Sequence, residues 1–268
     1  MARQCAPFLL LFLLLFISGC QQQPPTQATG AYYEIVVENR VCSGELCFSE
    51  YMVTESGLIF KKEITGNIHN APTISLARAA PELARAELGY VKNNIKQSSY
   101  PSCTQCTVYH FFYHDSNGTI WYGAKEPEAS DFVRSVRSRS EALFLSSEPQ
   151  ESVFVQLVYK KFGGPVVDFH IFGDGTVIHE EFSDWEAPLL SARMGTIDPI
   201  GIDSAISGFF EYTDDGVYPE ACARRGFEYS SLEASKGNGA TYNLANTCGA
   251  GNSNADIAFN KLLALVEK

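Results

Sequence analysis

Positive charge is scarce in this sequence. Its 268 residues include 20 Lys and Arg against 31 Asp and Glu, and the formal net charge is −11. Nucleic-acid binding depends on Lys and Arg that neutralise phosphates, and no basic stripe interleaved with aromatic residues occurs. The composition therefore excludes nucleic acid as a partner. It also predicts that anionic lipid repels the folded part of the protein, so that membrane attachment would require a separate anchor.

Familiar catalytic motifs are missing as well. The sequence contains no Gly-x-Ser-x-Gly, no His-Glu-x-x-His, no glycine-rich phosphate loop and no EF-hand loop. Without any of these motifs, binding is a better interpretation than catalysis. We expect no cofactor.

A long apolar segment is also lacking. The apolar run near the start extends from Phe8 to Ile17, about half of the roughly 20 residues that a membrane span requires. Together with the basic residue Arg3, this length is typical of the hydrophobic region of a secretory signal. The run ends close to Cys20.

Residues 17–20 read Ile-Ser-Gly-Cys, which resembles the lipobox of prokaryotic lipoproteins. The resemblance implies that residues 1–19 are a signal peptide and that Cys20 receives a thioether-linked diacylglycerol and becomes the first residue of the mature protein. In bacteria it also implies a third acyl chain such as palmitate, and two or more chains hold a protein stably on a membrane. Gln21 would favour the outer membrane in cells that have one. The alternative is an ordinary signal peptide that ends in cysteine.

The segment after Cys20 is polar, lacks periodicity and contains Pro24 and Pro25 side by side. This composition predicts a partly extended tether over residues 20–30. We therefore expect a lipid-anchored extracytoplasmic protein in the cell membrane or outer membrane, with a non-catalytic binding or scaffolding head. Its partners would be the membrane, reached through the acyl chains, and an unknown envelope protein or small ligand.

Six cysteines follow Cys20 in the chain, and an even number in an exported protein predicts three disulfides. They are Cys42, Cys47, Cys103, Cys106, Cys222 and Cys248. Many pairings are possible, and proximity in the sequence favours Cys42–Cys47, Cys103–Cys106 and Cys222–Cys248.

Cys103 and Cys106 have the C-x-x-C spacing of thiol oxidoreductases. In those enzymes the first cysteine lies at a helix N-terminus, which lowers its pKa, whereas residues 108–113 predict a strand. A structural disulfide is therefore favoured over a redox role. His110 and His114 complete a formal zinc spacing, but residues four apart on a strand lie about 13 Å from each other, too far to share one ion.

The head repeats its pattern at an interval of about 120 residues. Tyr100-Pro-Ser-Cys103 matches Tyr218-Pro-Glu-Ala-Cys222, Asn117-Gly118 matches Asn238-Gly239, and Ser56-Gly57 matches Asp174-Gly175. The alternative is chance, because glycine turns are common. We expect a duplicated α+β domain with repeats at 31–147 and 148–268. Each half should read ββ(β)α-ββα, with mainly antiparallel sheet and helices packed on one face.

Helix signals support this division. Pro81 suits a first helical turn, and Ala84, Leu88, Val91 and Ile95 follow it at helical spacing. A helix over Ser130–Leu143 would close the first half. Another would close the second half from Ser253, where Asp256 provides a start like a capping box.

The hairpin over Pro165–Phe182 contains the candidate site. A two-residue turn at Asp174-Gly175 would place His170 opposite His179, with Asp168 and Glu181 on the same face. A bulged turn with one more residue would change both faces, and a buried face normally prevents such a slip.

Imidazole and carboxylate groups are ligands for Zn²⁺ and similar ions. The matching positions of the first half are Glu50, Met52, Lys61 and Glu63, which include no histidine. Because antiparallel sheets commonly leave one face in water, a solvated face is the favoured interpretation. A metal-binding or metal-dependent protein that uses His170 and His179 is the alternative.

Residues 42–47 read Cys-Ser-Gly-Glu-Leu-Cys and are followed by Tyr51 and a Ser56-Gly57 turn. This start is similar to an uncharacterised bacterial secreted-domain family with a Cys-x-Gly-x-Cys-Pro-x-Tyr pattern before a strand that ends in Asp-Gly. The chain has one more residue between its cysteines and lacks the proline. The family has no known activity, so the resemblance implies no ligand.

Overall fold

The computed structural model describes residues 30–40, 42, 46–67, 70–96, 106–125, 131–183, 189–211, 219–237 and 241–267. The expected signal peptide, Cys20, Cys103 and the Asn238-Gly239 turn lie outside the described residues, as does the tether except Gly30. Within the described ranges, no helix has the length and apolar character needed to cross a membrane.

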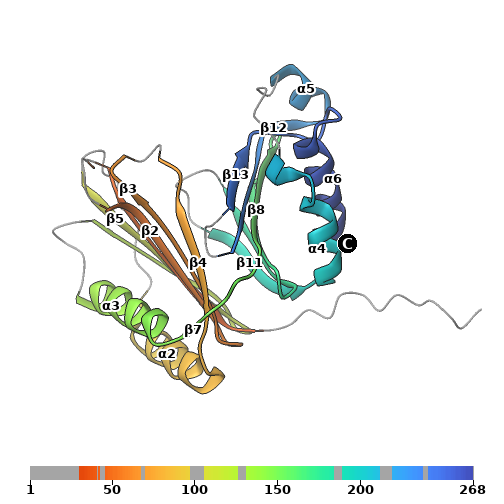
Figure 1. The fold of residues 1–268 in the computed structure, drawn as a ribbon. Coiled ribbons are helices and arrows are strands. Elements are labelled where there is room, and N and C mark those ends of the chain that lie inside the picture. Colours follow the sequence, from red (N-terminus) through yellow and green to blue (C-terminus); the bar gives the residue numbers. More distant parts are fainter. Residues whose placement is uncertain are drawn as a thin grey trace, which may run out of the picture.

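The first of two sheets has seven strands in the order β6-β5-β1-β2-β3-β4-β7. The strands are β1 (Tyr32–Asn39), β2 (Leu46–Thr54), β3 (Leu58–Thr65), β4 (Thr73–Arg78), β5 (Thr107–Asp115), β6 (Gly118–Lys125) and β7 (Glu148–Pro149). Helices α2 (Pro81–Asn94) and α3 (Asp131–Leu145) cover one face of this sheet (Figure 1). Strand β7 lies just past the expected boundary at residue 147 and extends the edge of the first sheet.

The second sheet has six strands in the order β11-β10-β9-β8-β12-β13. The strands are β8 (Phe154–Lys161), β9 (Val166–Phe172), β10 (Thr176–Phe182), β11 (Leu189–Thr196), β12 (Phe227–Lys236) and β13 (Thr241–Ala245). Helices α4 (Pro199–Ile206) and α6 (Asn254–Val266) pack on one face, and the short helices η1 (Phe209–Glu211) and α5 (Pro219–Arg224) lie between α4 and β12 in the chain.

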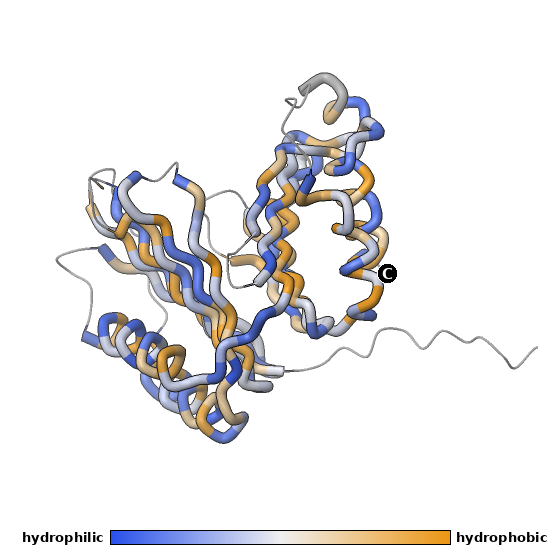
Figure 2. The backbone as a smooth tube through the Cα atoms, in the orientation of Figure 1, coloured by the Kyte–Doolittle hydropathy of each residue, from blue (hydrophilic) through white to orange (hydrophobic). Residues whose placement is uncertain are grey.

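The two sheets face each other, so the head has helices outside and two sheets inside (Figure 1). An apolar core joins the facing sides, and the rings of Phe60 and Phe154 lie 4.4 Å apart between centroids. Hydrophobic and hydrophilic residues alternate along the strands of both sheets (Figure 2). The three apolar cores show that each sheet has one face under helices and the other toward the neighbouring sheet.

Every strand pairing within the described ranges is antiparallel, and the α+β class with helices on one face of each sheet is confirmed. From β6 the first sheet runs β6-β5-β1-β2-β3-β4, and from β13 the second runs β13-β12-β8-β9-β10-β11. In both, the first helix comes after four strands along the chain: α2 follows β1 to β4, and α4 follows β8 to β11. The expectation of two or three strands before that helix is wrong, because β4 and β11 each add a strand.

The β9–β10 hairpin differs from the prediction by one residue. Its ladder pairs Ile171 with Val177 and Phe169 with His179. Gly175 adopts a φ of +90°, and its N–H donates to the Phe172 carbonyl at 2.8 Å. A glycine in the left-handed region closes a three-residue turn with a bulge, so the two-residue turn and the opposition of His170 to His179 are wrong.

This register places the two histidines on opposite faces of the second sheet. His170 shares its face with Asp168 and Glu180, whereas His179 shares the helix-covered face with Glu181. Both histidines are buried, with 2 % and 8 % of their surface exposed. The expectation of a solvated strand face is therefore also wrong, because the first sheet covers the side of Asp168 and His170 and helices cover the side of His179.

Local signals at other places are confirmed. Helix α2 begins at Pro81, and Ser253 with Asp256 forms a complete capping box at the start of α6. The disulfides Cys42–Cys47 and Cys222–Cys248 are present. Cys106 is disulfide-bonded, and its expected partner Cys103 lies outside the described residues.

Candidate functional site

Charged side chains meet between the two sheets in what we call the inter-sheet polar cluster. Its members are Glu34, Glu50 and Lys62 of the first sheet and Gln156, Asp168, His170, Glu180 and Glu233 of the second. Strand periodicity explains the positions, because alternate residues face the same side. On β1 the side that faces the second sheet carries Tyr32 and then Glu34. On β2 the same side carries Glu50 and then Met52, so each strand presents one acidic and one apolar residue there.

Lys62 connects the two sheets at one side of the cluster. Its Nζ donates to Glu233 Oε2 at 2.6 Å and to Gln156 Oε1 at 3.1 Å. Burial acts to lower the pKa of Lys62, but the charges of Glu233 and Glu50 hold it above its usual value. Lys62 therefore remains a cation and balances one carboxylate.

A second connection joins Tyr32 to Glu180. The Tyr32 hydroxyl donates to Glu180 Oε1 at 2.5 Å across the sheets. Burial raises the pKa of Glu180 to about 7, against the opposing influence of His170 and of this hydrogen bond. Burial and the Glu180 charge likewise raise the pKa of Tyr32 well above its usual value.

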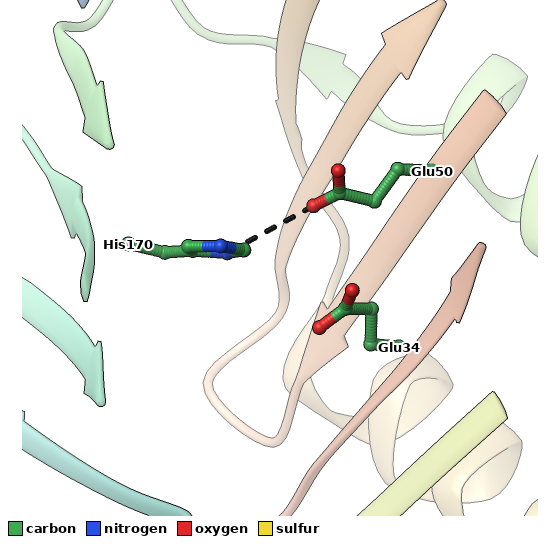
Figure 3. A group of neighbouring side chains, drawn as sticks. All are labelled: Glu34, Glu50 and His170. Carbon is green, nitrogen blue, oxygen red and sulfur yellow. Dashed lines mark ion pairs between the residues drawn. The ribbon is translucent and has the colours of Figure 1, made fainter. Parts of the chain in front are cut away.

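His170 is the imidazole of the cluster, and its two nitrogens have different surroundings. Nε2 lies 3.3 Å from Asp168 Oδ1, and the Gln156 amide donates to Asp168 Oδ2 at 2.8 Å. Nδ1 points toward the first sheet, 3.8 Å from Glu50 Oε1, and has no hydrogen-bond partner (Figure 3). Burial acts to lower the pKa of His170, but Asp168 and Glu50 raise it to about 9.

Glu34 and Glu50 approach His170 from neighbouring strands (Figure 3). Each carboxyl group has one oxygen without a hydrogen-bond partner. Burial raises the pKa of Glu34, reinforced by Glu180, and burial also raises the pKa of Glu50. One ligand atom from each of Glu34, Glu50 and His170 lies within 4.8 Å of the other two.

The cluster contains more acid than base. Its five carboxyl groups meet one lysine and one histidine. An unpaired charge in the interior costs several kcal/mol, so the excess carboxyl groups must keep protons or bind a cation. Either role suits groups that are enclosed between two sheets.

The structure divides the predicted site residues between two places. Asp168 and His170 belong to the inter-sheet polar cluster, whereas the His179 ring stacks on Phe169 at 4.3 Å on the other face. Arg193 donates to His179 Nδ1 at 2.6 Å, and burial together with Arg193 lowers the pKa of His179 to about 4. Glu181 accepts from Ser191 at 3.0 Å. A site that uses both His170 and His179 is therefore ruled out by the geometry.

Sequence reasoning missed Glu34, Lys62, Gln156, Glu180 and Glu233 of the cluster. Glu34 is a single acid within an otherwise apolar strand, Tyr-Tyr-Glu-Ile-Val-Val. Glu180 was expected on the opposite side of the hairpin from His170, because the predicted register placed its neighbours His179 and Glu181 on the His170 side. An acid at such a position was the available signal, since a buried carboxyl group needs a partner.

Comparison of the chain with protein-family models, with curated proteins and with solved structures gives no match.

Proposed function

We propose that this is a lipid-anchored protein of the cell envelope whose head binds or scaffolds without catalysis. The Ile-Ser-Gly-Cys sequence at residues 17–20 carries the proposal. Acylation of Cys20 would retain the protein at the membrane by burying two or more acyl chains. The membrane and an envelope protein or small ligand would be its partners.

The disulfides of the head support an extracytoplasmic location. Cys42–Cys47 and Cys222–Cys248 are bonded, and structural disulfides persist in oxidising compartments. The ionisable groups of the inter-sheet polar cluster lie enclosed between the sheets. Their enclosure supports binding rather than turnover of an external substrate, which would have to reach them.

We also propose that residues 31–147 and 148–268 are duplicated halves of one α+β unit, with four strands before its first helix and two strands and a helix after it. The matching strand orders support this proposal. So do the hairpin turns, because Gly57 and Gly175 have φ values of +92° and +90° at positions 118 residues apart.

Acyl labelling of the full chain in a bacterial host tests the anchor. Cys20→Ser should abolish incorporation of a palmitate analogue and release the protein from the membrane fraction. Cys5→Ser is the matched control, because Cys5 lies within the expected signal peptide. This variant should incorporate the palmitate analogue and remain in the membrane fraction as wild type does. Mass spectrometry of an unmodified chain that still carries residues 1–19 would contradict the proposal.

A further inference from the structure

His170 lies beside a carboxylate, as metal-binding histidines commonly do. Such residues usually donate the N–H of the ring nitrogen that does not bind the metal to a carboxylate, which sets the tautomer and aims the other nitrogen at the ion. Here Nε2 lies 3.3 Å from Asp168 Oδ1 and 3.2 Å from the Gln156 amide nitrogen, which also donates to Asp168 Oδ2 at 2.8 Å. When His170 is neutral with its proton on Nε2, the Nδ1 lone pair is directed at the first sheet.

Five atoms of the inter-sheet polar cluster lack hydrogen-bond partners, and three of these belong to Glu34, Glu50 and His170. These three are His170 Nδ1, Glu34 Oε2 and Glu50 Oε1, and each belongs to a residue with 5 % or less of its surface exposed. Buried polar atoms without partners are rare and call for an explanation. A shared ligand would satisfy all three at once, since each is of a type that coordinates metals.

The spacing allows such a ligand. One atom from each residue lies within 4.8 Å of the other two, and tetrahedral ions with bonds of about 2.0–2.1 Å bring their ligands to about 3.3 Å from each other. Rotation about the side-chain bonds of the two glutamates would bring the ligand atoms closer by the remaining distance of about 1.5 Å. The facing backbones would not need to move.

The charge balance points the same way. Glu233 is paired with Lys62, and Asp168 lies against His170. His170 also lies 3.8 Å from Glu50, but it must be neutral to bind a metal at Nδ1. In that state Glu34, Glu50, Asp168 and Glu180 have no cation of their own. A divalent cation would balance two of these carboxylates in an interior where unpaired charges are costly.

We infer that Glu34, Glu50 and His170 form a binding site for one divalent first-row transition ion. One imidazole and two carboxylates without a thiolate suit the Zn²⁺ and Mn²⁺ class of ions. The ion would join the first sheet to the second, because Glu34 and Glu50 come from β1 and β2 and His170 comes from β9. This site does not depend on the lipid anchor.

The test measures metal bound to the full chain, purified in detergent with its disulfides intact so that thiols do not compete. After treatment with a chelator, the protein is dialysed against Zn²⁺ or Mn²⁺ and its metal content is measured by mass spectrometry. Wild type should bind about one ion per chain, and the ion should raise the melting temperature. Glu34→Gln, Glu50→Gln and His170→Gln should each weaken binding by more than about 100-fold, and Asp168→Asn by about 10- to 100-fold.

His179→Gln is the matched control, since His179 lies on the same hairpin but faces the helices. It should retain wild-type metal content. Near-UV circular dichroism checks that each variant is folded, and the visible absorption of bound Co²⁺ reports the ligand set independently of stability. Folded wild type that binds neither Zn²⁺ nor Mn²⁺, or glutamine variants that bind as wild type does, would overturn the inference.

Discussion

Hairpins β2–β3 and β9–β10 occupy corresponding places in the two sheets, and both turn through a three-residue loop that ends in a glycine with positive φ. Their buried side chains differ. Glu50 of the first hairpin corresponds to Asp168 of the second, Met52 to His170, and Lys62 to Glu180. Where the hairpins face each other, the first provides a carboxylate and a lysine, and the second provides an imidazole and two acids.

The two hairpins therefore share the backbone conformation of the turn while their buried side chains differ in chemistry, so one does not determine the other. The turn depends on a glycine that tolerates a left-handed conformation. The polar cluster depends on a few side chains that project from either copy toward the other. An imidazole in one hairpin and acids in the other make a mixed ligand set that two identical hairpins would not.

The largest expected effect is at Lys62, which balances charge in the cluster. Lys62→Met should lower the free energy of unfolding by about 3–5 kcal/mol, because Glu233 would be left as a buried, unpaired charge. Glu180→Gln, at the corresponding position of the second hairpin, removes surplus acid and should cost less than about 1 kcal/mol. Denaturant unfolding measures the loss of stability in each variant. Equal losses would show that Lys62 and Glu180 contribute alike, against the difference between the hairpins.

The turn glycines should come next. Gly57→Ala and Gly175→Ala should each cost about 2–3 kcal/mol in denaturant unfolding, because φ is positive and a Cβ would collide with the carbonyl oxygen of Ala79 or of Ile197. Gly195→Ala is the control, since a Cβ there meets nothing within 4 Å. An unchanged stability of Gly175→Ala would argue against the three-residue turn.

A pH dependence distinguishes the helix-covered faces of the hairpins. Burial and Arg193 lower the pKa of His179 to about 4, so its contribution to stability is complete above the unfolded value of about 6.5 and is lost as pH falls toward 4. Solvent screening leaves an effect of about 1 kcal/mol. Lys61, at the corresponding position, keeps its charge throughout this range because Glu63 raises its pKa against the effect of burial.

Unfolding of His179→Gln across pH 4 to 7 measures this contribution. The variant should lose about 1 kcal/mol less stability than wild type on acidification. A steeper loss in the variant would show that His179 is protonated in the folded protein.

The smallest expected effect is at the ion pair that joins the turn of the second hairpin to the first sheet. Arg78 donates to Asp174 at 2.5 Å, and both side chains are partly exposed. Arg78→Ala should cost about 0.5 kcal/mol in thermal unfolding, with less effect at high salt. A loss above about 2 kcal/mol would mean that this pair contributes substantially to holding the two sheets together.

Several features could be predicted because neighbouring residues determine them. Pro81 begins α2, and Ser253 bonds with Asp256 three positions later to begin α6. Close spacing correctly paired Cys42 with Cys47. The alternation of side chains between the two faces of β9 was also predicted correctly, and Asp168 and His170 do share a face.

By itself, the sequence determined the class of fold, the helix starts and the local disulfides, because each depends on contacts within a few residues. Only the tertiary structure decided the register of β10 and the meeting of Glu34 with His170. Alternation selects a register when one strand face is polar and solvated. In β9 both faces are buried, one under helices and one under a sheet built from residues far away in the chain, so periodicity alone carried no information about which partner each face would meet.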